Sequence, residues 1–446
     1  MDDYRQRKEL FISNLNGTNL YETGSILING CATYFLCQIL KSTILSLSNI
    51  KYISIYNFFF ENFLIIIPLI LICTLLSSLS YIFHFIFWFI GFIIYFTKKN
   101  LTIKSIKINK QSYSHIIELF RGQILIATCI CILAVDFSIY PRRYAKTENY
   151  GYSIMDLGVG LFAISHGLVS SEVRNKQINI KELFFENLIL CLLGLIRLIL
   201  IKYFSYIEHI SEYGIHWNFF LTLCFMKLIG YYLLKIIKNL YLLIFLILLF
   251  HEFILLKYFQ FDNYLIQSSN NIRKNFIDAN REGIFSLSGY ICLYLIGILI
   301  GKFIIYNEYK KKFIYMGIIF FIFMIILCTI SYNPSRKLCN LSYITSTTGL
   351  ACMCLGCFSI IQWLLLRKGY LIETILIKNI NQKGLDIFLL ANILTGIINL
   401  NINTIDTSNF LSLFIILIYM FIIMIFTYFC PSFIKLIMKN LKLSKY

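Results

Sequence analysis

Charged residues are scarce in this sequence. Only 14% of its 446 residues are charged, whereas a soluble protein of this size keeps roughly 25%. The shortage excludes a soluble globular protein, and a 59% hydrophobic content with a mean hydropathy of +0.75 indicates a helical membrane protein. Proline and glycine are also few, at 4 and 22. The accompanying excess of Ile, Phe, Tyr, Asn and Lys is typical of AT-rich coding, which weakens any single lysine or asparagine as a functional signal.

Several catalytic signatures are missing as well. The sequence has no G-x-S-x-G, H-E-x-x-H, Walker A or dinucleotide fingerprint in a suitable context. We find no internal repeat and no stretch that predicts a soluble domain. Because Met1 to Asn14 is polar and charged, no cleavable signal peptide is expected. We therefore expect an all-α polytopic membrane protein that forms one domain over residues 1–446.

The cysteines and the positive charge first suggest other functions. Most of the 14 cysteines fall inside apolar segments, where a thiol behaves as a small hydrophobic group. Cys352, Cys354 and Cys357 form C-M-C-L-G-C without a nearby His or carboxylate, which favours core packing over a metal site. The net charge of +18 suggests nucleic-acid binding, but the lysines lie in short loops between apolar segments. The positive-inside rule is the simpler explanation, so no nucleic-acid partner is expected.

Thirteen segments are apolar enough to span a bilayer, which takes about 20 residues each. They are residues 25–46, 60–78, 80–97, 115–136, 154–171, 183–205, 215–233, 239–257, 284–301, 313–331, 341–366, 386–402 and 409–430.

The loops between these spans predict an orientation. Lysines concentrate at 98–113, at 302–312 and in the tail 431–446, which places this side in the cytosol. The opposite, lumenal side then holds most of the unusual polar sequences: the N-terminal segment 1–24, the stretch 136–156, the 206–214 turn, the 258–283 loop and the 403–408 turn.

The densest polar stretch runs from Asp136 to Asp156 and reads D-F-S-I-Y-P-R-R-Y-A-K-T-E-N-Y-G-Y-S-I-M-D. Ionisable groups close to a bilayer are costly and are therefore functional candidates. Asp136 ends the fourth span, where a partly desolvated carboxylate can accept a proton from a hydroxyl. We expect Lys146 to return across the loop and pair with it.

Other charges in this stretch are candidates for substrate binding. Arg142 and Arg143 follow the turn at Pro141 and offer fork-shaped donors that suit a phosphate. Glu148 and Asp156 complete the group. The alternative is that all these residues are interfacial charges in a solvated loop.

Two more polar motifs are expected on the same side. S-N-L-N-G-T near the start contains Asn14 and Asn16, the second of them in a glycosylation sequon. E-Y-G-I-H-W-N-F-F places His216 and Asn218 at the mouth of the seventh span. We include these four residues in the candidate substrate site, although His216 taken alone is more typical of an interfacial histidine.

Asn280, Arg281 and Glu282 precede the ninth span in D-A-N-R-E-G and are placed at a helix N-terminus, which suits an anion. The alternative is a helix cap with an interfacial anchor. Asn392 and Asn399 lie seven residues apart on one face of the twelfth span, where amides usually join helices.

Five ordered stretches make the sequence resemble the GPI inositol acyltransferase family. They are K-E-L-F-I-S-N-L-N-G-T, V-D-F-x-x-x-P-R-R-Y-A-K-T-E-x-Y-G with M-D-L-G-V-G, E-Y-G-x-H-W-N-F-F, A-N-R-E-G-I-x-S-L-x-G-Y and L-L-A-N-I-L-T-G-x-I-N-L. The resemblance implies a multi-pass protein of the endoplasmic reticulum with thirteen transmembrane helices, a lumenal N-terminus and a cytosolic C-terminus. It also implies Asp136 and Lys146 as the catalytic pair, with no bound cofactor and no metal.

The implied reaction is acyl transfer to the inositol of glucosaminyl-phosphatidylinositol within the lipid membrane. Its donor is acyl-CoA, with palmitoyl-CoA as the expected species. We expect direct transfer, without an acyl-enzyme. A transporter or flippase of lipids or anions is the alternative function, and a non-catalytic assembly subunit is a third. Substrate movement without acyl-CoA consumption would favour the transporter, and silent substitutions of Asp136 and Lys146 would favour the subunit.

Overall fold

The computed structural model describes most of the chain. The described residues are 2–13, 15–47, 54–98, 114–175, 180–203, 212–267, 273, 275–369, 374–433 and 436. Asn14, one of the predicted site residues, lies outside this part of the chain.

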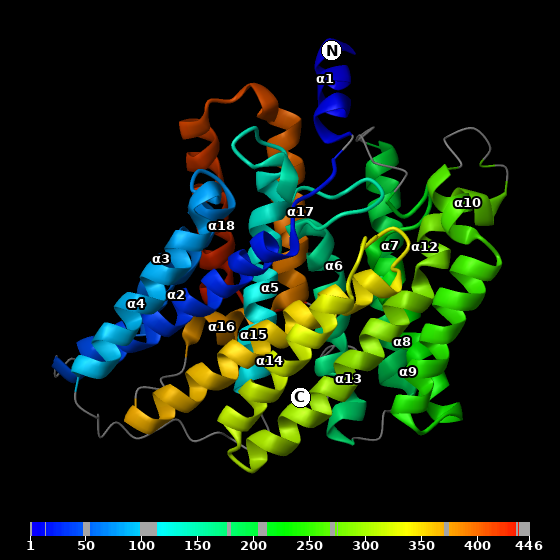
Figure 1. Ribbon diagram of the computed structural model, residues 1–446. Helices are drawn as coiled ribbons and strands as arrows, with labels where there is room; N and C mark the ends of the chain where they lie inside the picture. Colours follow the sequence, from blue (N-terminus) through cyan, green and yellow to red (C-terminus); the bar gives the residue numbers. More distant parts are fainter. Residues whose placement is uncertain are drawn as a thin grey trace.

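Thirteen helices long and apolar enough to cross a membrane occur in the described part, which confirms the predicted fold class. They pack as a helical bundle with no separate soluble domain (Figure 1). Twelve of these spans are mainly one helix: α2 (Leu20–Leu47), α3 (Ser54–Cys73), α4 (Ser80–Thr97), α5 (His115–Ala134), α6 (Ile154–Leu168), α7 (Ile180–Tyr203), α8 (Phe219–Ile236), α13 (Leu287–Tyr309), α14 (Phe313–Ile330), α15 (Leu341–Lys368), α17 (Gly384–Asn401) and α18 (Asn409–Phe429). The remaining span joins α9 (Leu240–Leu249) to the π-helix η4 (Phe250–Tyr258).

Shorter helices lie before or between the spans. They are α1 (Asp2–Ile12), α10 (Phe261–Gln267), α11 (Phe276–Ala279), α12 (Arg281–Phe285), α16 (Ile375–Gln382) and the 3₁₀ turns η1 (Ser77–Leu79), η2 (Arg142–Tyr144), η3 (Ser171–Arg174) and η5 (Thr404–Asp406). The sequence analysis did not predict α1, α10 or α16, because none is long and apolar enough to produce a hydropathy peak.

The centre of the bundle is formed by α2, α5, α13 and α15. Between 67% and 89% of the residues in their apolar windows are buried, against 17% for the windows in α4 and α7. The outer helices present apolar side chains such as Phe85 and Ile199 at their surface, as lipid-facing helices do. The C-M-C-L-G-C cysteines are buried inside α15, as the core-packing interpretation predicts.

Polar segments gather at one end of the bundle, where α1 stands beside the turns that follow α5 (Figure 1). The backbone links them: Thr18 N–H donates to the Tyr152 carbonyl at 2.7 Å, and Gly151 N–H donates to the Pro334 carbonyl at 2.9 Å. Gly17 has a φ of +77°, and a Cβ there would lie 2.3 Å from the Tyr152 carbonyl oxygen. Only glycine permits this approach, which explains the glycine of the N-G-T motif.

Candidate functional site

The site is built on the central loop, residues 135–153, which joins α5 to α6. Tight backbone turns follow α5, and Pro141 begins η2 with an extended backbone. Phe137, Tyr140 and Tyr144 are fully buried beneath the loop. These aromatic anchors fix a loop whose backbone is otherwise irregular, so the charged side chains between them have defined positions.

Asp136 lies two residues beyond the end of α5, with 13% of its side chain exposed. Its Oδ2 accepts a 2.8 Å hydrogen bond from the Asn399 side-chain amide. Its Oδ1 lies 3.6 Å from the Lys8 ammonium, beyond ordinary hydrogen-bond distance. The carboxylate is therefore shielded but only partly coordinated, which is the state a general base requires.

The predicted pairing of Lys146 with Asp136 is wrong. The Lys146 ammonium donates instead to Oε2 of Glu212 at 2.6 Å. The backbone N–H of the next residue, Thr147, donates to Asp156 on α6, so the chain beside Lys146 is anchored at the start of α6. Although burial alone would raise it, the pKa of Glu212 is lowered to about 2 by the Lys146 ammonium and the Arg336 guanidinium. Glu212 is thus a permanent anion beside Lys146.

Asp156 is the most completely bonded carboxylate of this region and is 2% exposed. Its Oδ2 accepts from the Thr147 backbone N–H, the Thr147 hydroxyl and the Ser153 hydroxyl at 2.7–2.8 Å. Its Oδ1 accepts from Nε of Arg336 at 2.6 Å. Asp156 therefore fixes the second half of the central loop on the N-terminus of α6, and its contacts are those of a structural residue.

Arg142 is mainly engaged by the loop itself. Its Nη2 donates to the carbonyls of Val135, Phe137 and Tyr140 at 2.7–3.4 Å, and its guanidinium lies 3.9 Å from the centre of the Phe11 ring. Burial lowers its pKa to about 10, so it remains charged at neutral pH. The Arg142 guanidinium, which was predicted to bind a phosphate, therefore mainly holds the turn after α5 in place.

Arg143 is the more open of the two arginines, with 40% of its side chain exposed. Its Nε donates to Oε1 of Glu22 at 2.8 Å, and the Tyr144 hydroxyl donates to the same oxygen at 2.7 Å. Part of the Arg143 fork therefore faces outward and is accessible to an anion.

Two further predicted site residues, Asn16 in the N-terminal segment and Glu148 in the central loop, are exposed. Asn16 has an exposed side chain at the edge of the central loop, and its backbone packs against Gly151. Glu148 is also exposed, and its backbone N–H donates to the Leu15 carbonyl at 3.1 Å. The structure brings both residues to the same end as Asp136.

His216 and Asn218 have different surroundings. The His216 side chain is exposed and its ring is stacked on Phe276, with 6.4 Å between ring centroids. Asn218 is 1% exposed; its side-chain oxygen caps α8 and its amide donates to the Gly194 carbonyl on α7. Asn218 is thus a structural cap, and His216 alone of the two is open to a ligand.

Asn280, Arg281 and Glu282 are all buried. Asn280 accepts the His216 backbone N–H at 2.7 Å, which joins this segment to the turn before α8. Glu282 receives two bonds from Arg273, at 2.7 and 3.1 Å, and a third from Arg281. The two cations already face a carboxylate, which disfavours an anion site, and the Asn280 side chain makes no cap hydrogen bond to α12, so the motif is not the simple helix cap of the alternative either.

Sequence reasoning missed Lys8, Glu22, Glu212, Arg273 and Arg336. Arg336 carried a usable signal, because S-Y-N-P-S-R-K-L-C-N lies between two apolar spans on the side predicted to be lumenal, as the central loop does. Lys8 and Glu212 begin the quoted stretches K-E-L-F-I-S-N-L-N-G-T and E-Y-G-I-H-W-N-F-F but were not singled out within them, and Glu22 and Arg273 gave no comparable signal. Among the described residues, no group of three His, Cys, Asp or Glu side chains could hold a metal ion.

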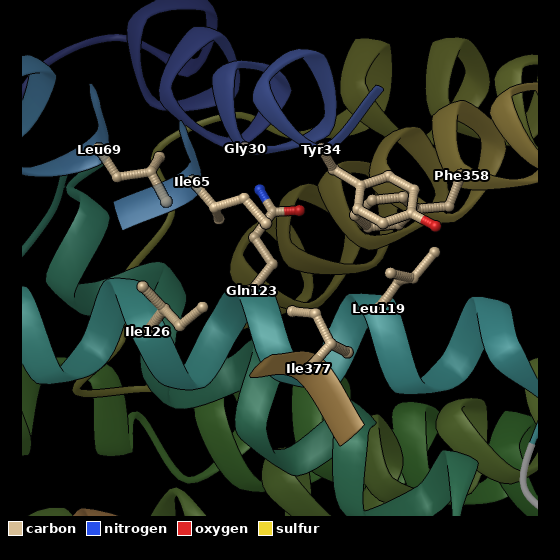
Figure 2. Close-up of a pocket in the computed structure, with 9 residues that line it drawn as sticks. All are labelled: Gly30, Tyr34, Ile65, Leu69, Leu119, Gln123, Ile126, Phe358 and Ile377. Carbon is tan, nitrogen blue, oxygen red and sulfur yellow. The ribbon is translucent and has the colours of Figure 1, made fainter. Parts of the chain in front are cut away.

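A small cavity lies deeper in the bundle, between α2, α3, α5, α15 and α16 (Figure 2). Its lining is apolar except for Tyr34 and Gln123, and about 10 Å³ is open to a water-sized sphere. This space accommodates roughly one water molecule. The cavity is too small for a substrate in this conformation, so the side-chain contacts and not the cavity define the candidate site.

The fold and the site together define a multi-pass membrane protein with a cluster of ion pairs at one end of its bundle. The sequence matches the GWT1 family over residues 4–430. The chain therefore belongs to this family, the GPI inositol acyltransferases, as the five sequence stretches indicated.

Relatives of known name cover nearly the whole chain. GPI-anchored wall transfer protein 1 of Schizosaccharomyces pombe is 33% identical, with 94% of this chain and 96% of the relative aligned. The protein of the same name in Saccharomyces cerevisiae is 31% identical, over 98% of this chain and 100% of its own. Phosphatidylinositol-glycan biosynthesis class W protein of Dictyostelium discoideum is 31% identical, over 94% and 96%. The family relationship supports an enzyme with a role in GPI-anchor biosynthesis.

Proposed function

We propose that the protein transfers an acyl group from acyl-CoA to the inositol 2-hydroxyl of glucosaminyl-phosphatidylinositol, with Asp136 as the general base. The observation that carries this proposal is the coordination of Asp136. Its carboxylate is shielded and oriented by Asn399, yet within the described part of the chain the closest cation to Oδ1 is Lys8, at 3.6 Å. A general base needs a carboxylate that is held in place and can still receive a proton.

The reaction is balanced without an acyl-enzyme. Asp136 accepts the proton of the inositol hydroxyl as that oxygen attacks the thioester carbonyl carbon. A carbon–oxygen bond forms, the carbon–sulfur bond breaks, and the departing thiolate takes the proton from Asp136. The products are acylated inositol and free CoA, and the carboxylate is regenerated.

Lys146 provides positive charge for the oxyanion that develops on the thioester oxygen. Its ammonium is held by Glu212 at 2.6 Å, and 32% of its side chain is exposed. This exposure leaves room for a substrate oxygen beside the Glu212 carboxylate. Lys146 therefore acts on the thioester oxygen and does not orient Asp136.

Phosphate recognition is assigned to Arg143. Arg142 spends most of its donors on loop carbonyls, whereas Arg143 is 40% exposed and keeps part of its fork outward. A guanidinium fork suits the phosphodiester of the glycolipid or a phosphate of CoA. Asn16, Glu148 and His216 are exposed at the same end and remain candidates for contacts with the acceptor headgroup.

The proposed setting is the membrane of the endoplasmic reticulum, with the N-terminus and the Asp136 site facing the lumen and the C-terminus in the cytosol. The lysine-rich loops 98–113 and 302–312 support this orientation through the positive-inside rule. The alignment with proteins named for GPI-anchored wall transfer and phosphatidylinositol-glycan biosynthesis supports the compartment and the acceptor.

The test is a reaction of the purified protein with palmitoyl-CoA and glucosaminyl-phosphatidylinositol, followed by mass spectrometry of the lipid. Asp136→Asn should lower the rate by about 10²–10⁴-fold, the contribution of a general base, without changing the thermal unfolding midpoint. Glu186→Gln is the matched control, because this half-exposed carboxylate also makes an ion pair, with Lys227, but belongs to α7 and not to the candidate site.

The outcomes separate the candidate functions. Near-normal turnover by Asp136→Asn would disprove the assignment of the base. A serine or cysteine ester trapped on the protein would replace direct transfer by a two-step reaction. Movement of the glycolipid across a vesicle membrane without release of CoA would favour the transporter instead.

A further inference from the structure

Two side chains from opposite ends of the sequence hold the Asp136 carboxylate. Asn399, at the end of α17, donates to Oδ2 at 2.8 Å. Lys8, on α1, lies 3.6 Å from Oδ1, and the Lys8 and Asp136 side chains are only 11% and 13% exposed. The two oxygens of this carboxylate are thus held differently, one by a short neutral donor and one by a more distant cation.

The position of Lys8 is fixed by its neighbours on α1. Arg7 makes two bonds to Asp406, at 2.8 and 3.2 Å, and the Phe11 ring lies under the Arg142 guanidinium at 3.9 Å. These contacts lie on either side of Lys8 along the helix. Helix α1 is therefore docked on the bundle, and the approach of Lys8 to Asp136 is part of this docking.

We propose that Lys8 and Asn399 are positioning residues for Asp136. Asn399 orients the carboxylate through Oδ2, so that Oδ1 is the oxygen that accepts the proton of the acceptor hydroxyl. Lys8 attracts Oδ1 electrostatically from 3.6 Å and so holds the second oxygen of the carboxylate in place. The proposal rests on the function proposed above, in which Asp136 is the base.

The chemistry explains why two different donors are used. A short bond from Asn399 holds one oxygen without adding charge, whereas a short bond from lysine to the reacting oxygen would compete with the incoming hydroxyl. At 3.6 Å the lysine acts through its field and leaves the lone pairs of Oδ1 accessible. Among the described residues, the charged groups brought to Asp136 are Lys8 from α1 and Arg142 from the central loop.

The test is the rate of acyl transfer by the intact protein, measured with palmitoyl-CoA and glucosaminyl-phosphatidylinositol. Lys8→Met removes one of the two cations near Asp136 and should lower kcat by about tenfold, with KM nearly unchanged. Lys8→Arg retains the charge and should keep kcat close to that of the unchanged protein. Lys227→Met is the control, because it breaks an ion pair with Glu186 of α7 and leaves α1 intact.

A second pair of variants tests the amide. Asn399→Leu should lower kcat and leave KM for the acceptor nearly unchanged. The reason is that this variant misorients the base but does not alter the binding site. Asn392→Leu is its control: that amide lies on the same helix and bonds to the Phe388 carbonyl of α17 itself. Its rate should equal that of the unchanged protein.

The outcomes either support or overturn the proposal. A kcat loss in Lys8→Met that Lys8→Arg does not show, with a kcat loss in Asn399→Leu but not in Asn392→Leu, supports it. An unchanged kcat in Lys8→Met, or an equal loss in Lys8→Arg, shows that the charge of Lys8 does not act on Asp136 and overturns it. Near-normal turnover in Asp136→Asn defeats the proposed function itself, so the two failures are distinguishable.

Discussion

Asp136 and Asp156 stand at either side of the central loop, and the structure treats them in opposite ways. Asp156 is 2% exposed and accepts from four donors, including the buried guanidinium of Arg336. Asp136 has one short hydrogen bond, from Asn399, and one longer contact with Lys8. Both residues belong to the same polar stretch of the sequence, so their surroundings in the fold make the difference.

The comparison separates a structural carboxylate from a reactive one. Four donors use most of the lone pairs of Asp156, and a buried anion so bonded holds segments together. Asp136 keeps accepting capacity on Oδ1 in a place with little water. A carboxylate can serve as a base only if it retains such capacity, which is why the proposed chemistry belongs at one side of the loop and the structural support at the other.

The largest expected effect on stability follows from breaking the Asp156–Arg336 pair. Asp156→Asn removes the anion that is bonded to the Arg336 guanidinium, which is only 4% exposed. Removing one partner of a buried ion pair lowers the free energy of unfolding by about 3–5 kcal/mol. We expect a clearly lower thermal unfolding midpoint in detergent. Asp136→Asn should leave the midpoint unchanged, so the two aspartates would differ in stability as they differ in coordination.

A double variant sharpens this prediction. Asp156→Leu combined with Arg336→Met removes both charges and should recover part of the lost stability, because the buried charge without a partner is the main cost. Equal midpoints for Asp156→Asn and the unchanged protein would contradict the structural role of Asp156.

The fold could be predicted from the sequence because hydrophobic length is a local property. The predicted spans at 313–331 and 409–430 correspond to α14 (Phe313–Ile330) and α18 (Asn409–Phe429) within one residue at each end. The largest difference occurs where polar residues extend a helix, at α13, which ends at Tyr309 and not at residue 301. Lys302, Asn307 and Glu308 lower the local hydropathy there without ending the helix.

The partners of the site residues could not be predicted in the same way. Arg336 lies 180 residues from Asp156 in the chain, and Asn399 lies 263 residues from Asp136. Nearness in sequence favours a pairing of Asp136 with Lys146, but in the fold the lysine bonds to Glu212, which is 66 residues away in the chain. Ion-pair partners depend on helix packing, which a single sequence does not reveal.

The second prediction concerns the pH dependence of the Lys146–Glu212 pair on the Asp156 side of the loop. The pKa of Glu212 falls from its ordinary 4.5 to about 2. The folded state therefore gains stability from this group above pH 4.5 and loses it as the pH falls toward 2. The difference in unfolding midpoint between the unchanged protein and Glu212→Gln should be largest at neutral pH and should decrease as the pH falls below 4.5. A difference that stays constant with pH would show that the ion pair is not its cause.

The smallest expected effect on stability is at Arg143, whose ion pair with Glu22 leaves 40% of the arginine side chain exposed. Partly exposed pairs contribute about 0.2–1 kcal/mol, so Arg143→Ala should barely change the unfolding midpoint. Arg7→Ala, which breaks another exposed pair at the same end, should change it as little. The two variants should differ in catalysis: if Arg143 binds a phosphate, its loss raises KM for the glycolipid or for acyl-CoA, whereas the loss of Arg7 does not. An unchanged KM for both substrates in Arg143→Ala would show that Arg143 does not bind a phosphate and has a structural role, as Asp156 has.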